Sequence, residues 1–233
     1  MAREFKLPKE IELPASPEEV WQAIATGPGL AAWLMPMEID PDSSEVAEWD
    51  PPRKLTIRTP AAEDGSTNAF EYLIEGRDGG TSVLRFVHSG VLGDDWSDEY
   101  EGMTSSGWDM YLFTLAQYLR HFHGRPASYA EAQAPAVGGW DRLHRLLAPV
   151  RLGGQVTIDL PGGGRIRGEV DYLTEQFIGL RTSDELIRFH ERSAIGMPIA
   201  VSDHHYGALA DPQQRAERWQ HWLAAAIDQG DQA

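Results

Sequence analysis

Histidine and tyrosine are the side chains of this 233-residue chain that best suit proton transfer. The sequence has eight histidines, seven tyrosines and no cysteine. Imidazole titrates near neutral pH, and a phenol can donate a proton or a hydrogen bond. His88 with Tyr72 or Tyr111 is therefore the candidate acid–base set, provided that the fold brings these groups within hydrogen-bond reach. Without cysteine, the chain forms no disulfide, no thiolate nucleophile and no cysteine-bound metal site.

Residue spacing disfavours a metal site and a nucleotide site. Asp203, His204 and His205 are adjacent, but neighbours in an extended segment point to opposite faces, so we expect a structural or surface role. The glycine run 162–168 has strand-like sequence on both sides, which predicts a hairpin turn instead of a dinucleotide loop. Asp94 and Asp95 belong to an acidic loop that we interpret as solvated surface. The sequence thus predicts no metal and no cofactor.

The charge of the chain limits its partners. Thirty-six acidic and twenty basic residues give a formal net charge of −16 at pH 7. Such a field repels phosphate backbones and anionic headgroups, so we expect neither nucleic acid nor a membrane as partner.

No apolar run approaches the roughly 20 residues needed to span a bilayer, and the polar start lacks the apolar core of a signal peptide. A cytoplasmic location is predicted, while the oligomeric state stays undetermined.

The first half of the chain has the pattern of a strand, two short helices, a strand meander and a long helix. Residues 5–13 are expected to form an opening strand, which Pro8 confines to a sheet edge or a bulge. Ser16, Pro17 and Glu19 form a capping box at the start of the first helix. Strands are predicted at 55–59, 69–76 and 81–88, before an amphipathic helix that ends at Gly124 and Pro126.

Three features of this half resemble a known family. They are the segment SPEEVWQAIATGPGLAAWL (16–34), Trp49 after an acidic loop, and GWDMYLFTLAQYLRHF (107–122). Together they resemble the START-like helix-grip (SRPBCC) superfamily, and within it the bacterial, mostly uncharacterised branch that is similar to the activator of the heat-shock-protein ATPase. The resemblance implies an α+β helix-grip fold over 1–124, with an antiparallel sheet wrapped around a long C-terminal helix.

The second half reads as a separate unit. Residues 125–139 are rich in alanine, proline and glycine and are predicted to be a linker. The region 140–230 is expected to contain a short helix, strands from 156 onward and a closing helix that starts after Asp211. Two interpretations stay open. This unit is either a trimmed, divergent helix-grip copy without the opening strand, or an unrelated α+β extension.

The resemblance also implies a cavity between the long helix and the sheet. Aromatic and methionine side chains suit the walls of an apolar pocket. We expect the following residues to line it: Trp33, Met37, Trp49, Tyr72, Phe86, His88, Trp108, Tyr111, Leu112 and Leu115.

The favoured hypothesis from the sequence is binding of a small hydrophobic or aromatic molecule in this cavity, without catalysis. Two alternatives stay open. One is an enzyme that uses the same pocket, as the resemblance to polyketide cyclases and aromatases implies. The other is a protein that interacts with a chaperone ATPase, as the name of the branch implies.

Overall fold

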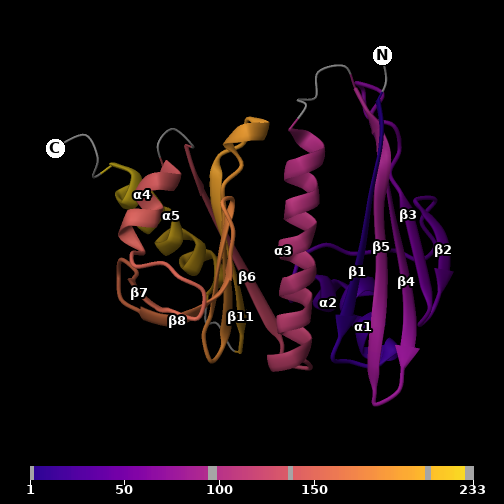
Figure 1. Cartoon of the computed structure of the whole chain (residues 1–233), viewed down its shortest axis with the longest axis horizontal. Coiled ribbons are helices and arrows are strands. Elements are labelled where there is room, and N and C mark those ends of the chain that lie inside the picture. Colours follow the sequence, from indigo (N-terminus) through magenta and orange to yellow (C-terminus); the bar gives the residue numbers. More distant parts are fainter. Residues whose placement is uncertain (1–2, 94–98, 136–138, 208–210, 229–233) are drawn as a thin grey trace. The chain divides into compact units, whose positions relative to one another are not determined.

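Two compact units make up the chain in the computed structural model, residues 1–124 and residues 125–233. The structure describes residues 3–93, 99–135, 139–207 and 211–228. Asp94 and Asp95, which we expect to be solvated, lie outside the described residues. Each unit has its own antiparallel sheet and its own closing helix (Figure 1). The units are therefore described one at a time.

The first unit is a five-stranded sheet with a long helix on one face. Its elements are β1 (Arg3–Leu13), α1 (Pro17–Ala25), α2 (Gly27–Ala31), β2 (Val46–Asp50), β3 (Lys54–Arg58), β4 (Thr67–Arg77), β5 (Thr81–Leu92) and α3 (Tyr100–His121). The sheet order is β1-β5-β4-β3-β2, with antiparallel neighbours throughout. The opening strand thus pairs with the last strand of the meander, as expected for a helix-grip fold.

Local sequence explains how the unit begins. The Ser16 hydroxyl accepts a hydrogen bond from the Glu19 backbone N–H, and the Glu19 carboxylate accepts one from the Ser16 N–H at 2.8 Å. This is the predicted capping box. Pro8 lies in β1, an edge strand, where a missing N–H is tolerated. Gly29 is required where α2 meets α1, because an added Cβ would lie 2.0 Å from the Gln22 carbonyl oxygen.

Helix α3 covers the segment predicted to be helical, and its burial extends beyond the predicted apolar face to the polar side chains of Thr114 and Gln117. Leu112, Leu115 and Leu119 are all buried. Polar contacts add to this packing, since Lys9 on β1 forms an ion pair with Asp109 at 2.7 Å and donates a hydrogen bond to Ser105 at 2.8 Å. Helix α3 therefore lies against β1 through apolar and charged contacts together (Figure 1).

The second unit is larger than the sequence predicts. Its elements are β6 (Ala127–Ala134), α4 (Gly139–Leu146), β7 (Gln155–Asp159), β8 (Arg165–Leu173), β9 (Phe177–Arg181), β10 (Glu185–His190), η1 (Ser193–Ile195), β11 (Ile199–Tyr206) and α5 (Pro212–Asp228). The six strands follow the order β6-β11-β10-β9-β8-β7.

The predicted linker at 125–139 is wrong, because most of it is strand β6. This strand pairs with β11 from Ala127 opposite Tyr206 to Ala134 opposite Ile199. In each unit, therefore, the opening strand pairs with the last strand and a helix closes the chain path. The predicted α+β helix-grip fold is confirmed for the first unit, and the second repeats its strand arrangement with one more strand and with its opening strand present. It is not a trimmed copy.

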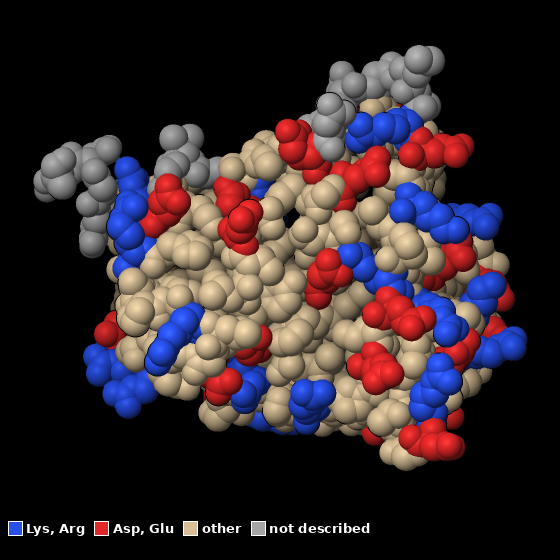
Figure 2. Space-filling model, viewed as in Figure 1, with Lys and Arg blue, Asp and Glu red and all other residues tan. Residues whose placement is uncertain are grey.

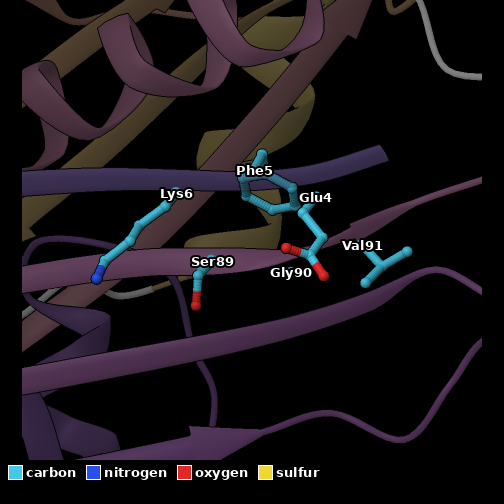
Figure 3. Close-up of a pocket in the computed structure, with 6 residues that line it drawn as sticks. All are labelled: Glu4, Phe5, Lys6, Ser89, Gly90 and Val91. Carbon is cyan, nitrogen blue, oxygen red and sulfur yellow. The ribbon is translucent and has the colours of Figure 1, made fainter. Parts of the chain in front are cut away.

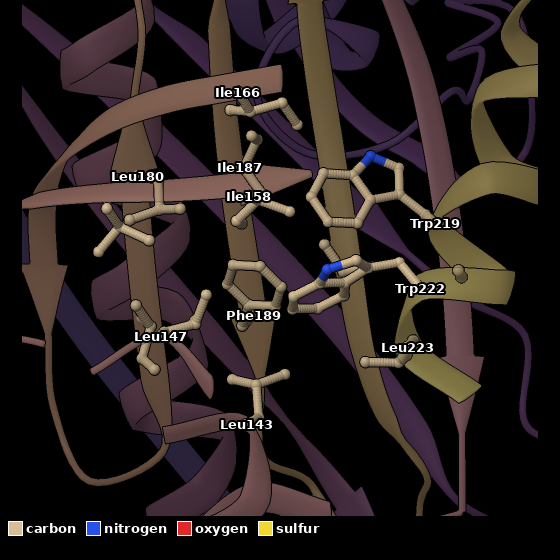
Figure 4. Packing of buried hydrophobic residues seen from close by; sticks show 14 of the residues in the cluster. Leu143, Leu147, Ile158, Ile166, Leu180, Ile187, Phe189, Trp219, Trp222 and Leu223 are labelled. Atoms are coloured by element: carbon tan, nitrogen blue, oxygen red, sulfur yellow. The ribbon is translucent and has the colours of Figure 1, made fainter. Parts of the chain in front are cut away.

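Apolar side chains from α4, α5 and the sheet fill the core of the second unit. Trp219 and Trp222 of α5 lie with ring centroids 5.9 Å from Phe189 of β10 (Figure 4). Trp219 and Phe189 are fully buried. The glycines Gly162, Gly163 and Gly164 have positive φ angles in the turn between β7 and β8, which confirms the predicted hairpin.

A buried ion pair crosses the second sheet. Arg188 of β10 donates two hydrogen bonds to the Asp171 carboxylate of β8, at 3.0 and 3.1 Å. Gly179 of β9 lies between them, and a Cβ there would lie 2.6 Å from an Asp171 oxygen and 2.8 Å from an Arg188 nitrogen. Only glycine leaves room for this pair.

The burial of α3 leads to a stability prediction. Leu115 is completely buried, so Leu115→Ala should lower the free energy of unfolding by roughly 2 to 5 kcal/mol, because burial is lost and a cavity is left. Arg120→Ala on the exposed side of the same helix is the control and should stay within about 0.5 kcal/mol. Denaturant unfolding measures both, and a near-neutral Leu115→Ala would contradict the helix-grip packing.

Candidate ligand site

The candidate site is an aromatic cluster on the face of the first sheet that α3 covers. His88 and Phe86 lie two residues apart on β5, opposite Phe70 and Tyr72 on β4. Because side chains two apart in a strand share a face, all four point to the same side. Trp108 of α3 contacts this set, with its ring centroid 4.3 Å from that of Phe86. The cluster thus joins two adjacent strands and the long helix.

His88 is the polar centre of the cluster. Its Nε2 lies 2.9 Å from the Asn68 side-chain oxygen, and its Nδ1 accepts a hydrogen bond of 3.0 Å from the Trp108 indole N–H. The Phe70 ring stacks on the imidazole at 4.5 Å, and the Phe5 ring meets it edge-on at 4.9 Å. An imidazole that accepts at Nδ1 and donates from Nε2 is the neutral tautomer.

Burial keeps this imidazole uncharged. His88 is 4% exposed, and burial lowers the pKa of its imidazole to about 4. The Tyr72 phenol is also buried, and burial raises its pKa well above the ordinary value. At neutral pH both groups therefore carry no charge, and the inner part of the cluster is electrically neutral.

The outer part of the cluster keeps exposed aromatic surface. Phe70, Trp108 and Tyr111 are half-buried, whereas Tyr72 and Phe86 are buried. The ring centroid of Trp108 lies 6.0 Å from that of Phe70 and 5.9 Å from that of Tyr111. The rings of Phe70 and Tyr111 thus both lie near the Trp108 indole.

The structure brings together half of the predicted pocket residues. Tyr72, Phe86, His88, Trp108 and Tyr111 form the cluster described above. Leu112 and Leu115 lie on the same helix as Trp108, in the packed core.

Three predicted pocket residues lie elsewhere. Trp33 is completely buried, and its indole donates to the Ala23 carbonyl at 2.9 Å, so it packs α1 against the residues after α2. Trp49 packs edge-on against Trp21 at 5.0 Å. Met37 is 44% exposed in the segment between α2 and β2. None of the three has a described ring contact or hydrogen bond with the His88 cluster.

Phe5, Asn68 and Phe70 belong to the cluster but were not among the predicted pocket residues. A signal for the last two was present, because Asn68, Phe70 and Tyr72 alternate along β4 and must share a face. The role of Asn68 depends on the β4–β5 register, which sets it diagonally across from His88. The spacing along the chain alone does not show that contact.

A groove of about 530 Å³ lies at the paired ends of β1 and β5. Glu4, Phe5, Lys6, Ser89, Gly90 and Val91 line it (Figure 3). Its charged side chains come from alternate positions of β1, so they lie on the face opposite to the Phe5 ring. This open, partly charged groove is a poorer match for an apolar molecule than the aromatic cluster.

The second unit has a polar cluster at the corresponding place in its fold. Asp203 on β11 accepts a hydrogen bond of 2.7 Å from the Trp219 indole of α5, as His88 accepts one from Trp108. Glu185 lies opposite His205 in the strand pairing, as Asn68 lies opposite Gly90. The two units therefore share this arrangement, with an amide and a neutral imidazole in the first and two carboxyl groups in the second.

His204 and His205 point to opposite faces, as predicted. His204 is completely buried beside the Tyr129 ring, whereas His205 lies 3.3 Å from a Glu185 oxygen. Asp203 is buried too, so of the two expected roles the structural one applies to Asp203 and His204, and the surface one does not. Among the described residues, no group of three acidic or histidine side chains is placed to hold a metal ion.

Charged side chains of both signs are interspersed on the face shown in Figure 2. Of the helices that the structure describes, none combines the length and the apolar character needed to cross a membrane.

Comparison with known proteins gives matches to solved structures. DynU16, a protein from the dynemicin biosynthetic locus, is 16% identical with a TM-score of 0.40, and the match covers 95% of each chain. The Aha1 dimer from Colwellia psychrerythraea is 17% identical with a TM-score of 0.40, over 49% of this chain and 96% of that one. CalU16 from Micromonospora echinospora is 16% identical with a TM-score of 0.38, over 51% and 86%.

These structures are similar to this chain at the level of the Aha1-like, SRPBCC type of fold. At such identities and TM-scores the likeness says nothing about ligand or activity. No protein-family model and no curated protein sequence matches the chain.

The environment of His88 predicts a specific pH dependence. We expect its imidazole, followed by NMR, to stay neutral down to about pH 5 and to titrate near pH 4. The folded-state pKa lies below the value of about 6.5 for an exposed histidine, so the unfolded chain takes up the proton first as pH falls. The contribution of the neutral His88 imidazole to the free energy of unfolding is complete above about pH 6.5 and is lost between pH 6.5 and 4. The total loss is roughly 3 kcal/mol.

Two variants test this assignment. His88→Gln should show a smaller loss of stability between pH 6.5 and 4 than the unmodified protein. His221→Gln, on the exposed side of α5, should keep the original pH dependence. An imidazole of His88 that titrates at its ordinary pKa would show that it is not buried as described.

Proposed function

We propose that the first unit binds a small, uncharged hydrophobic or aromatic molecule against the half-buried rings of Phe70, Trp108 and Tyr111. The observation that carries the proposal is the contrast within the cluster. Its inner members Tyr72, Phe86 and His88 are buried, whereas the outer rings of Phe70, Trp108 and Tyr111 stay partly exposed. Grouped aromatic rings with remaining exposure are typical of ligand-binding surfaces.

The electrostatics of the site support an uncharged ligand. The histidine at its centre is neutral at pH 7, and the chain carries a net charge of −16. A buried cation would lack a charged partner in the cluster, and an anion would meet an unfavourable overall field. The resemblance to helix-grip proteins also implies an apolar cavity between helix and sheet, and this is where the cluster lies.

Catalysis by His88 is less favoured than binding. An acid–base histidine needs a ring nitrogen within reach of the substrate and a pKa near the working pH. Here Nδ1 accepts from Trp108, Nε2 contacts Asn68, and the pKa is about 4. We therefore assign His88 the role of positioning Trp108, and propose a binding protein that needs no cofactor.

Fluorescence titration tests the proposal. Nile red is an uncharged aromatic dye whose emission increases in apolar surroundings, and we expect it to bind the full chain, to quench tryptophan emission and to raise the melting temperature. Tyr111→Ala and Trp108→Ala should each weaken binding by at least about tenfold, because each removes one of the three grouped rings.

The matched control is Trp140→Ala. Trp140 is a half-buried tryptophan of the second unit that contacts the Glu175 carbonyl, and its loss should leave Nile red affinity unchanged. A dye that binds equally well to all three variants, or a broad panel of apolar compounds without any effect on melting, would contradict the proposed site.

A further inference from the structure

The second unit contains a buried ionic cluster that joins α5 to the sheet. Arg215 in the first turn of α5 donates to an Asp203 oxygen at 2.7 Å and to the Glu185 carboxylate. Trp219, one turn later, donates to the same Asp203 oxygen. His205 lies 3.3 Å from Glu185. Strands β10 and β11 and helix α5 therefore meet at this one cluster.

Arg215 stands at a helix position that is unfavourable for a cation, and the two buried carboxylates account for its presence there. A cation in the first turn of a helix faces the positive end of the helix dipole, which is unfavourable. The side chains of Glu185 and Asp203 are only 9% and 0% exposed, so they need compensation from nearby donors. Arg215 donates to both carboxylates, although its own position in the first turn of the helix is unfavourable for a cation.

One guanidinium is nevertheless insufficient for two buried carboxylates. The other oxygen of Asp203, Oδ1, is buried and has no hydrogen-bond partner among the described residues. Asp184, next to Glu185, adds further negative charge. Burial and the neighbouring Asp203 charge raise the pKa of Glu185 to about 8, and Arg215 only partly opposes this. A proton on Glu185 removes one of the two buried negative charges, so that one guanidinium is sufficient.

The charged and titratable groups around Glu185 come from several elements. β11 contributes Asp203 and His205, and α5 contributes Arg215. Arg165 and Arg167 of β8 line a shallow pocket with Glu185, and Arg125 donates to the carbonyl oxygens of Ser183 and Tyr206 nearby. Arg165 is already paired with Asp159 at 2.6 Å. Arg215 is thus the one of these cations that directly contacts the Glu185 carboxylate in the described structure.

The first unit has an uncharged side chain at the position equivalent to Glu185. There the equivalent of Glu185 is Asn68, whose amide oxygen contacts His88, the equivalent of Asp203. A protonated carboxyl group, like an amide, is uncharged and offers both a donor and an acceptor. The comparison of the two units therefore supports an uncharged side chain at this position of the fold.

We propose that Glu185, Asp203 and Arg215 form a proton-dependent latch for helix α5. When Glu185 is protonated, Arg215 and Trp219 both donate hydrogen bonds to Asp203, and these contacts hold the first turns of α5 on β10 and β11. When Glu185 loses this proton, two buried carboxylates share one guanidinium. The repulsion between the two carboxylates then loosens the start of α5. The second unit thus responds to mildly alkaline pH.

NMR of the full chain tests the latch directly. The Trp219 indole N–H reports on Asp203, and its resonance should shift with a midpoint near pH 8. Glu185→Gln keeps an uncharged side chain of the same size, so this shift should be absent in that variant. The matched control is Glu217→Gln on the exposed side of α5, which should titrate as the unmodified protein does.

Stability against pH gives an independent measurement. The pKa of Glu185 is higher in the folded chain than in the unfolded chain, so its contribution is complete below about pH 4.5 and is lost as pH rises through 8. Denaturant midpoints should therefore fall between pH 5 and 8 more steeply in the unmodified protein and in Glu217→Gln than in Glu185→Gln.

Two outcomes would overturn the latch. One is a Trp219 resonance that does not move between pH 6.5 and 9.5. The other is a titration that survives in Glu185→Gln, which would assign it to His205. Should Glu185→Gln fail to fold, the carboxyl carbon shift of Glu185 in the unmodified protein decides, since a fully ionised carboxylate at pH 7 contradicts the proposal.

Discussion

Both units depend on one hydrogen bond between the closing helix and the last strand of the sheet. In the first unit the Trp108 indole donates to His88, and in the second the Trp219 indole donates to Asp203. An indole N–H between a helix and a sheet needs an acceptor, so the contact fixes how far the helix is rotated about its own axis. That rotation in turn decides which helix residues face the sheet, including Leu115 in α3 and Leu223 in α5. A helix that packed only through apolar side chains would have no such unique register, because hydrophobic contact is not directional.

The chemistry of the acceptor then separates the two units. A neutral histidine, completed by Asn68, lets the first unit keep an uncharged interior with aromatic rings at its edge. An aspartate in the same place demands a cation, and Arg215 brings Glu185 into the cluster with it. The apolar region beside it is filled by Phe189, Trp219 and Trp222, which contact one another edge-on or tilted (Figure 4). An apolar ligand would have to displace these rings. Two similar strand arrangements therefore hold an uncharged aromatic cluster in one unit and an ionic cluster in the other.

Elements with strong local signals were predictable from the sequence, and elements held by tertiary pairing were not. The capping box at Ser16 and the long helix α3 follow from residue types and periodicity. Strand β6 has the sequence ASYAEAQA, in which alanine and glutamate disfavour strands, and its conformation comes from pairing with β11. Within the site, aromatic residues were recognisable, but nothing in the sequence distinguishes Trp108 in the cluster from Trp33 in the core. The contacts of Asn68 with His88 and of Glu185 with Arg215 join residues 20 and 30 positions apart, and only the strand register and the helix rotation bring them together.

The two clusters also show why the charge of one residue has effects beyond its own contacts. Asn68 and Glu185 occupy equivalent positions, yet replacing the amide by a carboxyl group changes which neighbours are tolerated. A carboxylate at position 68 would lie beside an imidazole that burial already keeps neutral. It would favour protonation of His88 and disfavour acceptance of the Trp108 hydrogen bond by Nδ1, since a charged imidazole has no acceptor nitrogen. The helix would then lose the contact that sets its rotation. An aromatic ligand site at this place in the fold therefore requires an uncharged side chain at position 68, and the ionic cluster of the second unit requires that α5 supply the arginine.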